Sequence, residues 1–170
     1  MNGARYNNGV SMNILILYYS KGGNTRNLAE AIAQGVSQVD GVKAALRHTR
    51  EVTKEDFLTA NGLVVGSPVY FGTMAAQLKQ ILDDFVGVRK KMENKVGAAF
   101  STSGDASGGK ETTMISIIQA LLIYGLIIVG DPMSATGHYG TACVGTPDAA
   151  ALENGRKLGR RVAELVKRLA

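Results

Sequence analysis

The segment SKGGNT, residues 20–25, brings hydroxyl, ammonium and amide groups together around two adjacent glycines. Adjacent glycines let the backbone curl so that successive N–H groups point toward one centre. A helix expected to begin at Asn24 would add the unpaired N–H groups of its first turn, which attract anions. An N-capped turn without a ligand would use the same residue types. The anion-binding interpretation predicts a phosphate site made of Ser20, Lys21, Gly22, Gly23, Asn24 and Thr25.

Two further segments could surround a flat ring. PVYFG, residues 68–72, places two aromatic side chains beside a proline and a glycine, although these could also pack on neighbouring loops. STSGDASGG, residues 101–109, is more polar and richer in glycine than a minimal connection requires, and its backbone could match the edge of a heterocycle. A phosphate site, an aromatic wall and a polar edge together indicate flavin mononucleotide (FMN). The expected ring contacts are Pro68, Val69, Tyr70, Phe71, Gly72, Ser101, Thr102, Ser103, Gly104, Gly108 and Gly109.

Other chemistries fit the sequence less well. GDASGGKE, residues 104–111, approaches the nucleotide-binding pattern G-x-x-x-x-G-K-[ST], but Glu111 stands where a hydroxyl would bind magnesium. No His/Cys cluster has metal-ligand spacing and no G-x-S-x-G motif occurs, so no metal site is predicted. We interpret His48, expected near the end of the second strand, as structural.

Alternating apolar strands and amphipathic helices must position these segments. The pattern predicts strands near 12–19, 42–48, 61–67, 95–102 and 126–130, and helices near 24–38, 53–59, 73–86, 110–123 and from 149. Such alternation is typical of an α/β fold with a parallel sheet, in which ligands bind at the carboxyl ends of the strands. TACVG is also strand-like, so the fifth strand could be split by an insertion around 130–140.

Composition and charge narrow the class of protein. The 170 residues suit a single domain over 1–170, with 1–11 expected to form a loose extension. Without a membrane span or a signal peptide, and with the single cysteine Cys143, the chain is expected to be cytoplasmic. Of the net charge of +5, the last 20 residues supply +4, from 6 basic and 2 acidic side chains. We predict a solvated helix face there, and no binding of nucleic acid, because no aromatic platform accompanies the charge.

On these three motifs the chain resembles the flavodoxin-like superfamily, and within it the WrbA-type NAD(P)H:quinone oxidoreductases. The resemblance covers most of residues 12–146. It implies a three-layer sandwich with a five-stranded parallel sheet in the order 2-1-3-4-5, FMN as cofactor and NAD(P)H as electron donor. Gly22 stands where the family usually has a threonine, and Tyr124 where the group commonly has a histidine facing the flavin. GHYGT, residues 137–141, resembles a segment near the ring, which makes Tyr139 a cofactor contact and Phe71, Tyr124 and His138 candidate pocket residues.

The fold alone does not separate an enzyme from a carrier of single electrons. Carrier flavodoxins are typically acidic and often cover the ring with tryptophan, whereas this chain is basic and has no tryptophan. We therefore expect two-electron reduction of a quinone by a ping-pong mechanism. The alternatives are a carrier flavodoxin served by a redox partner protein and a non-catalytic flavin-binding module. A homodimer or homotetramer is expected from the resemblance, whereas the preferred nicotinamide and the physiological acceptor stay open.

Overall fold

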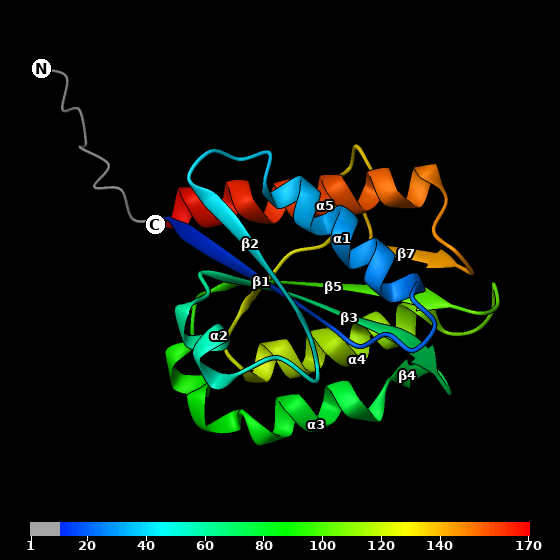
Figure 1. Cartoon of the computed structure of the whole chain (residues 1–170), viewed down its shortest axis with the longest axis horizontal. Helices are drawn as coiled ribbons and strands as arrows, with labels where there is room; N and C mark the ends of the chain where they lie inside the picture. Colours follow the sequence, from blue (N-terminus) through cyan, green and yellow to red (C-terminus); the bar gives the residue numbers. More distant parts are fainter. Residues whose placement is uncertain (1–10) are drawn as a thin grey trace, which may run out of the picture.

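A computed structural model describes residues 11–170 (Figure 1). Apart from Ser11, the expected N-terminal extension lies outside the described residues. In chain order the elements are β1 (Met12–Tyr18), α1 (Asn24–Val36), β2 (Val42–His48), α2 (Lys54–Thr59), β3 (Gly62–Tyr70), β4 (Thr73–Met74), α3 (Ala76–Asp84), the 3-10 helix η1 (Val86–Lys91), β5 (Val96–Ser103), α4 (Lys110–Ile123), β6 (Ile127–Ile128), β7 (Gly140–Val144) and α5 (Ala149–Leu169).

The strands form one parallel sheet in the order β2-β1-β3-β5, with β6 and β7 both beside β5. The short β4 only folds back antiparallel onto β3, so this is the expected order 2-1-3-4-5, which is confirmed. Ile127 pairs with Val96, and Gly140 pairs with Ala99. The fifth strand position is thus shared by two pieces, as the strand-like TACVG segment predicted, and residues 129–139 form the insertion between them.

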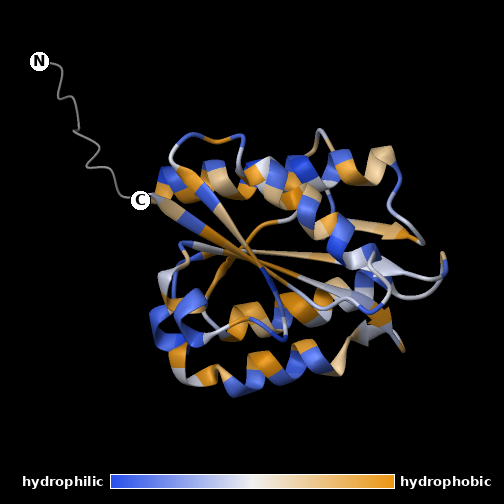
Figure 2. Cartoon of the chain, in the orientation of Figure 1, coloured by the Kyte–Doolittle hydropathy of each residue, from blue (hydrophilic) through white to orange (hydrophobic). Residues whose placement is uncertain are grey.

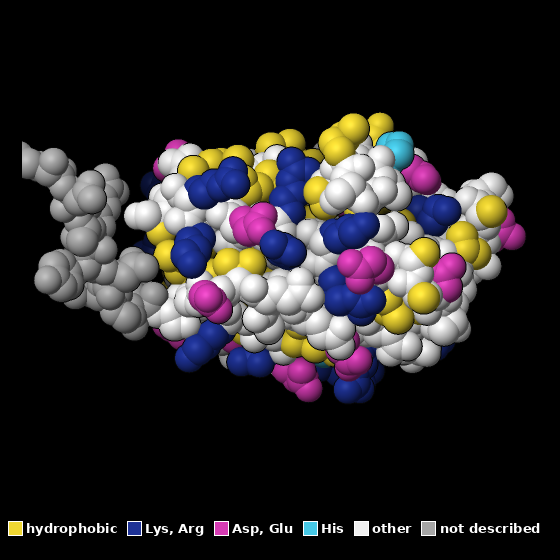
Figure 3. All heavy atoms as spheres, turned by 90° about the horizontal axis from the view of Figure 1, so that it is seen from above, with side chains coloured by type: hydrophobic (Ala, Val, Ile, Leu, Met, Phe, Trp, Pro, Cys, Tyr) yellow, Lys and Arg dark blue, Asp and Glu magenta, His cyan; other side chains and the backbone are white. Residues whose placement is uncertain are grey.

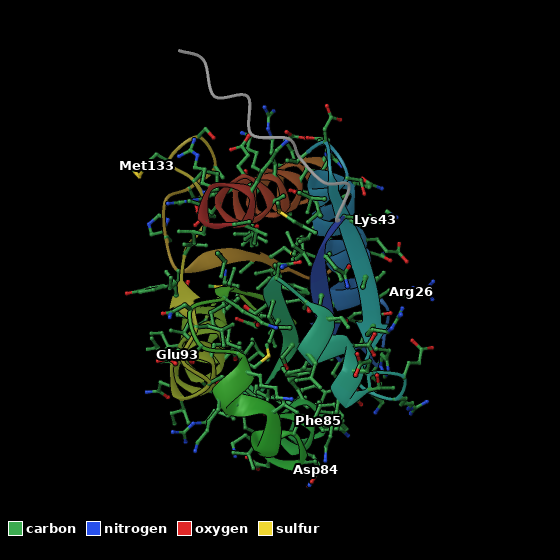
Figure 4. All side chains as sticks on the ribbon, turned by 90° about the vertical axis from the view of Figure 1, so that its left-hand side faces the viewer. Arg26, Lys43, Asp84, Phe85, Glu93 and Met133 are labelled. Atoms are coloured by element: carbon green, nitrogen blue, oxygen red, sulfur yellow. The ribbon has the colours of Figure 1, made fainter. Side chains whose placement is uncertain are left out.

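Both faces of the sheet are covered, which explains the continuous apolar runs of its strands. Side chains alternate between the faces: Ile14 and Ile16 pack toward α1 and α5, and Leu15 and Leu17 pack toward α2, α3 and α4. Figure 2 shows apolar residues along the strands and on the inner sides of the helices. Figure 4 views the resulting three layers from the amino ends of the strands.

The expected boundary after the third strand is wrong. β3 continues to Tyr70, turns at Phe71 and Gly72, and returns as β4. The backbone N–H of Ala75 then donates to Ser67 Oγ at 2.8 Å, and α3 begins only at Ala76 rather than near residue 73. Helical periodicity in the sequence could not reveal this hairpin, because Met74 in the returning strand also fits the apolar stripe of the helix.

A buried carboxylate organises the insertion. Asp131 is 2% exposed and accepts hydrogen bonds from the backbone N–H groups of Thr136, Gly137 and His138 and from the Thr136 hydroxyl. Burial tends to raise the pKa of Asp131, but the hydrogen bonds from Thr136, His138 and Gly137 outweigh it and lower the pKa. Folding therefore favours the ionised form of this carboxyl group.

Asp131→Asn is expected to lower the free energy of unfolding by about 2 kcal/mol at neutral pH, because charge-assisted hydrogen bonds are lost. Since the folded-state pKa is depressed, the carboxylate stabilises the protein above its ordinary pKa of 3.8, and this contribution is lost as the pH falls through the folded-state value. Urea denaturation of both proteins from neutral to acidic pH measures this. Asp40→Asn, at an exposed carboxylate, is the control. A difference between Asp131→Asn and wild type that does not shrink in acid would contradict the assignment.

The basic face of α5 is extensively paired. Arg156 bonds Glu153 at 2.8 Å and Arg160 bonds Glu164 at 3.0 Å, while Arg161 donates to carbonyl oxygens of the insertion. Figure 3 shows positive and negative side chains interspersed on the face that carries α1 and α5. The absence of nucleic-acid binding stays a prediction. Across residues 11–170, no helix is long and apolar enough to cross a membrane.

Candidate functional site

The carboxyl ends of β1, β3 and β5 lie at the same end of the sheet, on the right in Figure 1, together with the start of α1. The loop 20–25 there has a defined shape: the N–H of Gly23 donates to Ser20 Oγ at 3.1 Å. Gly23 has φ of +96°, a left-handed conformation that favours glycine. Within the described residues no side chain caps α1, and its first turn carries no acidic residue. The first-turn N–H groups and the positive end of the helix dipole are thus oriented to receive an anion.

Thr25 and Thr102 connect this loop to the end of β5. Their hydroxyl oxygens are 2.8 Å apart, and the side chains are almost fully buried, with exposed fractions of 2% and 4%. This hydrogen bond holds the start of α1 beside β5. Thr25 therefore contributes to the site at least by fixing the helix N-terminus, and its backbone N–H belongs to the first turn. Lys21 and Gly22 are exposed, and Asn24 is half-buried.

His48 is a residue of this site that the sequence interpretation left out. Its Nε2 atom lies 3.4 Å from the backbone N and O of Ser20, and its ring contacts Tyr18 and Tyr19. Together with Lys21, Arg26 and Arg50 it lines a recess of about 330 Å³ beside the loop. Because β2 is the neighbour of β1, the ends of both strands meet here. The expected strand order already placed the second strand beside the first, so it could have predicted that His48 lies next to the loop 20–25.

The hairpin between β3 and β4 carries the aromatic side chains. Phe71 and Gly72 form its two-residue turn with φ of +50° and +77°, as in a type I′ turn. A bulky side chain is rare at positive φ, where it strains the backbone, and Phe71 is also fully exposed. Tyr70 is half-buried, with its ring centroid 6.1 Å from that of Tyr19. A strained and exposed aromatic residue at the strand ends is best explained by a ligand that it covers.

Phe71→Asn is expected to stabilise the protein by about 1 kcal/mol, because asparagine followed by glycine is favoured in this turn and no buried surface is lost. The same change should lower the flavin content, since the aromatic wall expected beside the ring disappears. Thermal unfolding and flavin content, measured on the same preparation, test both parts. Leu169→Asn, at an exposed apolar residue at the end of α5, is the control. A loss of stability in the Phe71 variant would show that the turn is not strained.

The third segment is held by its own hydroxyl groups. Ser101 Oγ donates to the carbonyl of Lys110 at 3.1 Å, and Ser103 Oγ donates to the carbonyl of Asp105 at 2.8 Å. Ser101, Thr102 and Ser103 are buried strand residues of β5, and only residues 104–107 are fully exposed. A ligand would therefore meet the backbone of 104–109 rather than these hydroxyl groups. The Thr112 hydroxyl donates to the Gly72 carbonyl at 2.6 Å and ties this loop to the aromatic hairpin.

Three other candidates lie apart from the strand ends. Tyr124 follows the last residue of α4, at the opposite end of the sheet, where it is 3% exposed and donates its hydroxyl to the Leu82 carbonyl at 2.6 Å. Burial and, to a smaller extent, the charge of Asp83 raise its pKa to about 12. Tyr124 therefore lies away from the loop 20–25 but lines one groove with Phe71, so its assignment as a pocket residue stays a prediction. His138 and Tyr139 are exposed. Gly140, which follows them, pairs with Ala99, four residues before β5 ends at Ser103, so both side chains lie before the carboxyl end of the sheet.

Cys143 and metal ions offer no alternative chemistry in the described part of the chain. Cys143 is half-buried, and burial raises the pKa of its thiol to about 11, which keeps it protonated. Among residues 11–170, no group of three or more His, Cys, Asp or Glu side chains could hold a metal ion. What the structure brings together is therefore an anion-binding helix start, an aromatic hairpin and a glycine-rich polar loop.

Comparisons with known proteins find an FMN reductase family, a flavodoxin and an NAD(P)H dehydrogenase (quinone). The family model described as NADPH-dependent FMN reductase matches residues 45–141. The chain is 36% identical to a flavodoxin from Aquifex aeolicus, over 90% of this chain and 86% of that protein. It is 31% identical to an NAD(P)H dehydrogenase (quinone) from Archaeoglobus fulgidus, over 92% of this chain and 98% of that protein. A solved flavodoxin, WrbA-like protein from Agrobacterium tumefaciens has the same fold, with a TM-score of 0.80 at 23% identity, over 93% of this chain and 99% of that one.

Proposed function

Because this chain belongs to the family of NADPH-dependent FMN reductases, we propose that it is an FMN-dependent oxidoreductase that transfers two electrons from NAD(P)H to a quinone. The balanced reaction is NAD(P)H + H⁺ + quinone → NAD(P)⁺ + hydroquinone. The observation that carries the proposal is the uncapped start of α1 beside an aromatic hairpin and a glycine-rich loop, all at one end of the sheet.

The residues at this end fit FMN. Ser20 to Thr25 would hold the phosphate through backbone N–H groups and hydroxyls, with the α1 dipole favouring its charge. The hairpin 68–72 would cover the ring, and the backbone of 104–109 would meet its polar edge. When bound, FMN supplies the ability to take two electrons from a nicotinamide and give them to an acceptor. The protein supplies binding, orientation and an opening through which each substrate can approach in turn.

Two features favour an enzyme over a carrier. The chain lacks tryptophan and its only aromatic residues on the ring-side hairpin are Tyr70 and Phe71, of which Phe71 stands clear of the fold. A ring with an accessible face admits nicotinamide, whose hydride must come within close stacking distance. The recess beside the phosphate loop carries Lys21, Arg26 and Arg50 against the single carboxylate of Glu51, and this net positive charge suits an anionic nicotinamide nucleotide. A proton-transfer role for Tyr124 is excluded from the proposal, because its hydroxyl is buried and already bonded.

A carrier flavodoxin is the second candidate, and the name of the Aquifex aeolicus relative supports it. Such a carrier would exchange electrons with a separate reductase and a protein acceptor rather than with quinones. The sequence also led us to expect a homodimer or homotetramer, and a redox partner protein in the case of a carrier. Both expectations stay proposals, because an enzyme and a carrier would differ in their partners.

The deciding experiment uses the full chain loaded with FMN under anaerobic conditions. An enzyme should lose its flavin absorbance on mixing with NADH or NADPH alone and regain it on addition of benzoquinone. Initial rates at several quinone concentrations should give parallel double-reciprocal lines, since the two substrates use one site in turn. The proposal fails if the flavin absorbance survives both nicotinamides but responds to an added flavodoxin reductase. Protein that takes up no FMN would refute both candidates.

A further inference from the structure

The imidazole ring of His48, the last residue of β2, is held on three sides. Tyr18 meets it edge-to-face, with the ring centroids 5.4 Å apart and an interplanar angle of 83°, and the Tyr19 ring lies 5.6 Å away at 46°. On the third side, the backbone N–H of Arg50 donates to His48 Nδ1 at 3.2 Å. Aromatic contacts and a hydrogen bond thus fix the orientation of the ring beside the loop 20–25.

The hydrogen bond from Arg50 decides which nitrogen of the His48 ring carries the proton. In a neutral imidazole one nitrogen donates and the other accepts. Because Nδ1 accepts from the Arg50 N–H, the proton lies on Nε2. Nε2 is 3.4 Å from both the carbonyl oxygen and the backbone N of Ser20, and as a donor it bonds the oxygen. His48 therefore donates to the carbonyl of the first residue of the loop.

The direction of the Ser20 carbonyl matters for the donors of the loop. In a trans peptide group, a C=O and the N–H that follows it point in opposite directions. Holding the Ser20 oxygen on the β2 side therefore directs the Lys21 N–H away from β2. Among residues 11–170, no backbone acceptor bonds the N–H of Lys21 or Gly22. An anion site needs such N–H groups turned inward, whereas a carbonyl oxygen turned inward would repel a phosphate.

The glycines of the loop make a restraint of this kind valuable. A Cβ atom at Gly22 would meet nothing within 4 Å, and glycine adopts both signs of φ, so the backbone there has room to turn. The bond from the Gly23 N–H to Ser20 Oγ restrains the Ser20 side chain rather than its carbonyl. Restricting a binding loop to its bound conformation strengthens binding, because less entropy is lost when the ligand arrives.

We propose that His48 is a positioning residue for the FMN phosphate: by holding the Ser20 carbonyl oxygen, it keeps the Lys21 N–H directed at the phosphate. This inference rests on the proposed function, because it takes the loop 20–25 as the phosphate site. No proton or electron passes through His48 in this role. The role is narrower than the structural one expected from the sequence, since it concerns binding of a phosphate rather than stability of the fold.

The experiment compares His48→Leu, which removes the donor at similar volume, with His48→Gln, whose amide N–H can reach the position of Nε2. FMN and riboflavin are titrated by fluorescence against the flavin-free full chain and both variants. His48→Leu should weaken FMN binding by about threefold to tenfold, as expected for one hydrogen bond, and change riboflavin binding by less than about twofold. His48→Gln is the matched control and should keep most of the FMN affinity.

Nitrogen NMR of the unmodified, flavin-free chain tests the geometry without any variant at position 48. At about pH 8, where an imidazole is ordinarily neutral, His48 should show a protonated Nε2 and an unprotonated Nδ1. The chain has two histidines, so the spectrum of His138→Gln assigns the resonances. The opposite tautomer would refute the inference, even if His48→Leu failed to fold.

The titrations can overturn the inference in three further ways. Equal losses for FMN and riboflavin in His48→Leu would show that the ring supports the fold alone. An FMN affinity as low in His48→Gln as in His48→Leu would show that the donor is not the cause. Unchanged FMN affinity in both variants would show that the loop needs no restraint from His48. These outcomes leave the proposed function standing, whereas an unmodified chain that binds no FMN refutes the proposed function and the inference together.

Discussion

Replacing Asn24 with glutamate is expected to weaken FMN binding by about a hundredfold or more while it leaves the fold intact or slightly more stable. Asn24 is the first residue of α1, where no side chain caps the helix and no acidic residue occupies the first turn. A carboxylate there interacts favourably with the helix dipole, which contributes about 0.3–1 kcal/mol to stability. The same carboxylate would stand close to the phosphate. Two like charges about 4 Å apart near a protein surface repel by about 4 kcal/mol, less when solvent screens them.

Two controls make the test of Asn24→Glu specific. Riboflavin lacks the phosphate, so its affinity should change by less than about threefold if the repulsion is with phosphate. Asn27→Glu introduces the same charge one turn later, where the backbone N–H already donates to the Gly23 carbonyl at 2.9 Å, and it should have little effect on either ligand. Fluorescence titrations with both flavins measure the affinities. Equal losses for FMN and riboflavin would place the phosphate elsewhere.

Gly159→Ala is expected to lower the free energy of unfolding by about 3 kcal/mol. α1 and α5 pack closely on the same face of the sheet, and a Cβ atom on Gly159 would lie 2.0 Å from the Ile32 carbonyl oxygen. That contact is with backbone, so the two helices must separate and part of the apolar core beneath them must open. Alanine favours a helix over glycine by about 1 kcal/mol, which offsets only part of the cost. Urea denaturation without flavin measures the effect independently of binding.

Gly155→Ala is the matched control, one turn earlier on the same helix. A Cβ atom there would lie 3.1 Å from Leu28 Cδ1, the end of a side chain that can shift. Helix propensity and slight crowding then oppose each other, and the stability should change by less than about 1 kcal/mol. If the two variants lose the same stability, the cost comes from something other than the backbone contact at Gly159.

The strands could be located from the sequence because buried parallel strands need continuous apolar runs, which polar loops interrupt. Since the strands are parallel, the loops that follow them could be placed together at one end of the sheet. Even the split fifth strand left a signal, since TACVG is apolar enough to occupy a covered edge. The residues of the phosphate loop followed from the same pattern. Their assignment to FMN stays a prediction that the titrations above would test.

The hairpin and Tyr124 were harder for different reasons. A type I′ turn usually contains Asn, Asp or Gly at its first central position, so Phe71 gave no indication of a turn. Tyr124 could have been placed from helix length alone, because the 14 residues of α4 rise about 21 Å and carry their end to the far side of the sheet. His48 lies at the end of β2, which the expected strand order already placed beside β1, so its position at the site could have been predicted as well.

The divided fifth strand also bears on how this protein behaves when crowded. An uninterrupted outer strand presents a row of unpaired backbone groups that can pair with the same row of another molecule and seed aggregates. Here one outer position is divided between the two residues of β6 and the five of β7, with the insertion carrying Met133 between them. At the opposite border of the sheet, β2 carries the exposed Lys43. Figure 4 shows Met133 and Lys43 on opposite sides of the molecule. Neither border offers a long, flat and uncharged row, so concentrated solutions should resist fibril formation through strand-to-strand pairing.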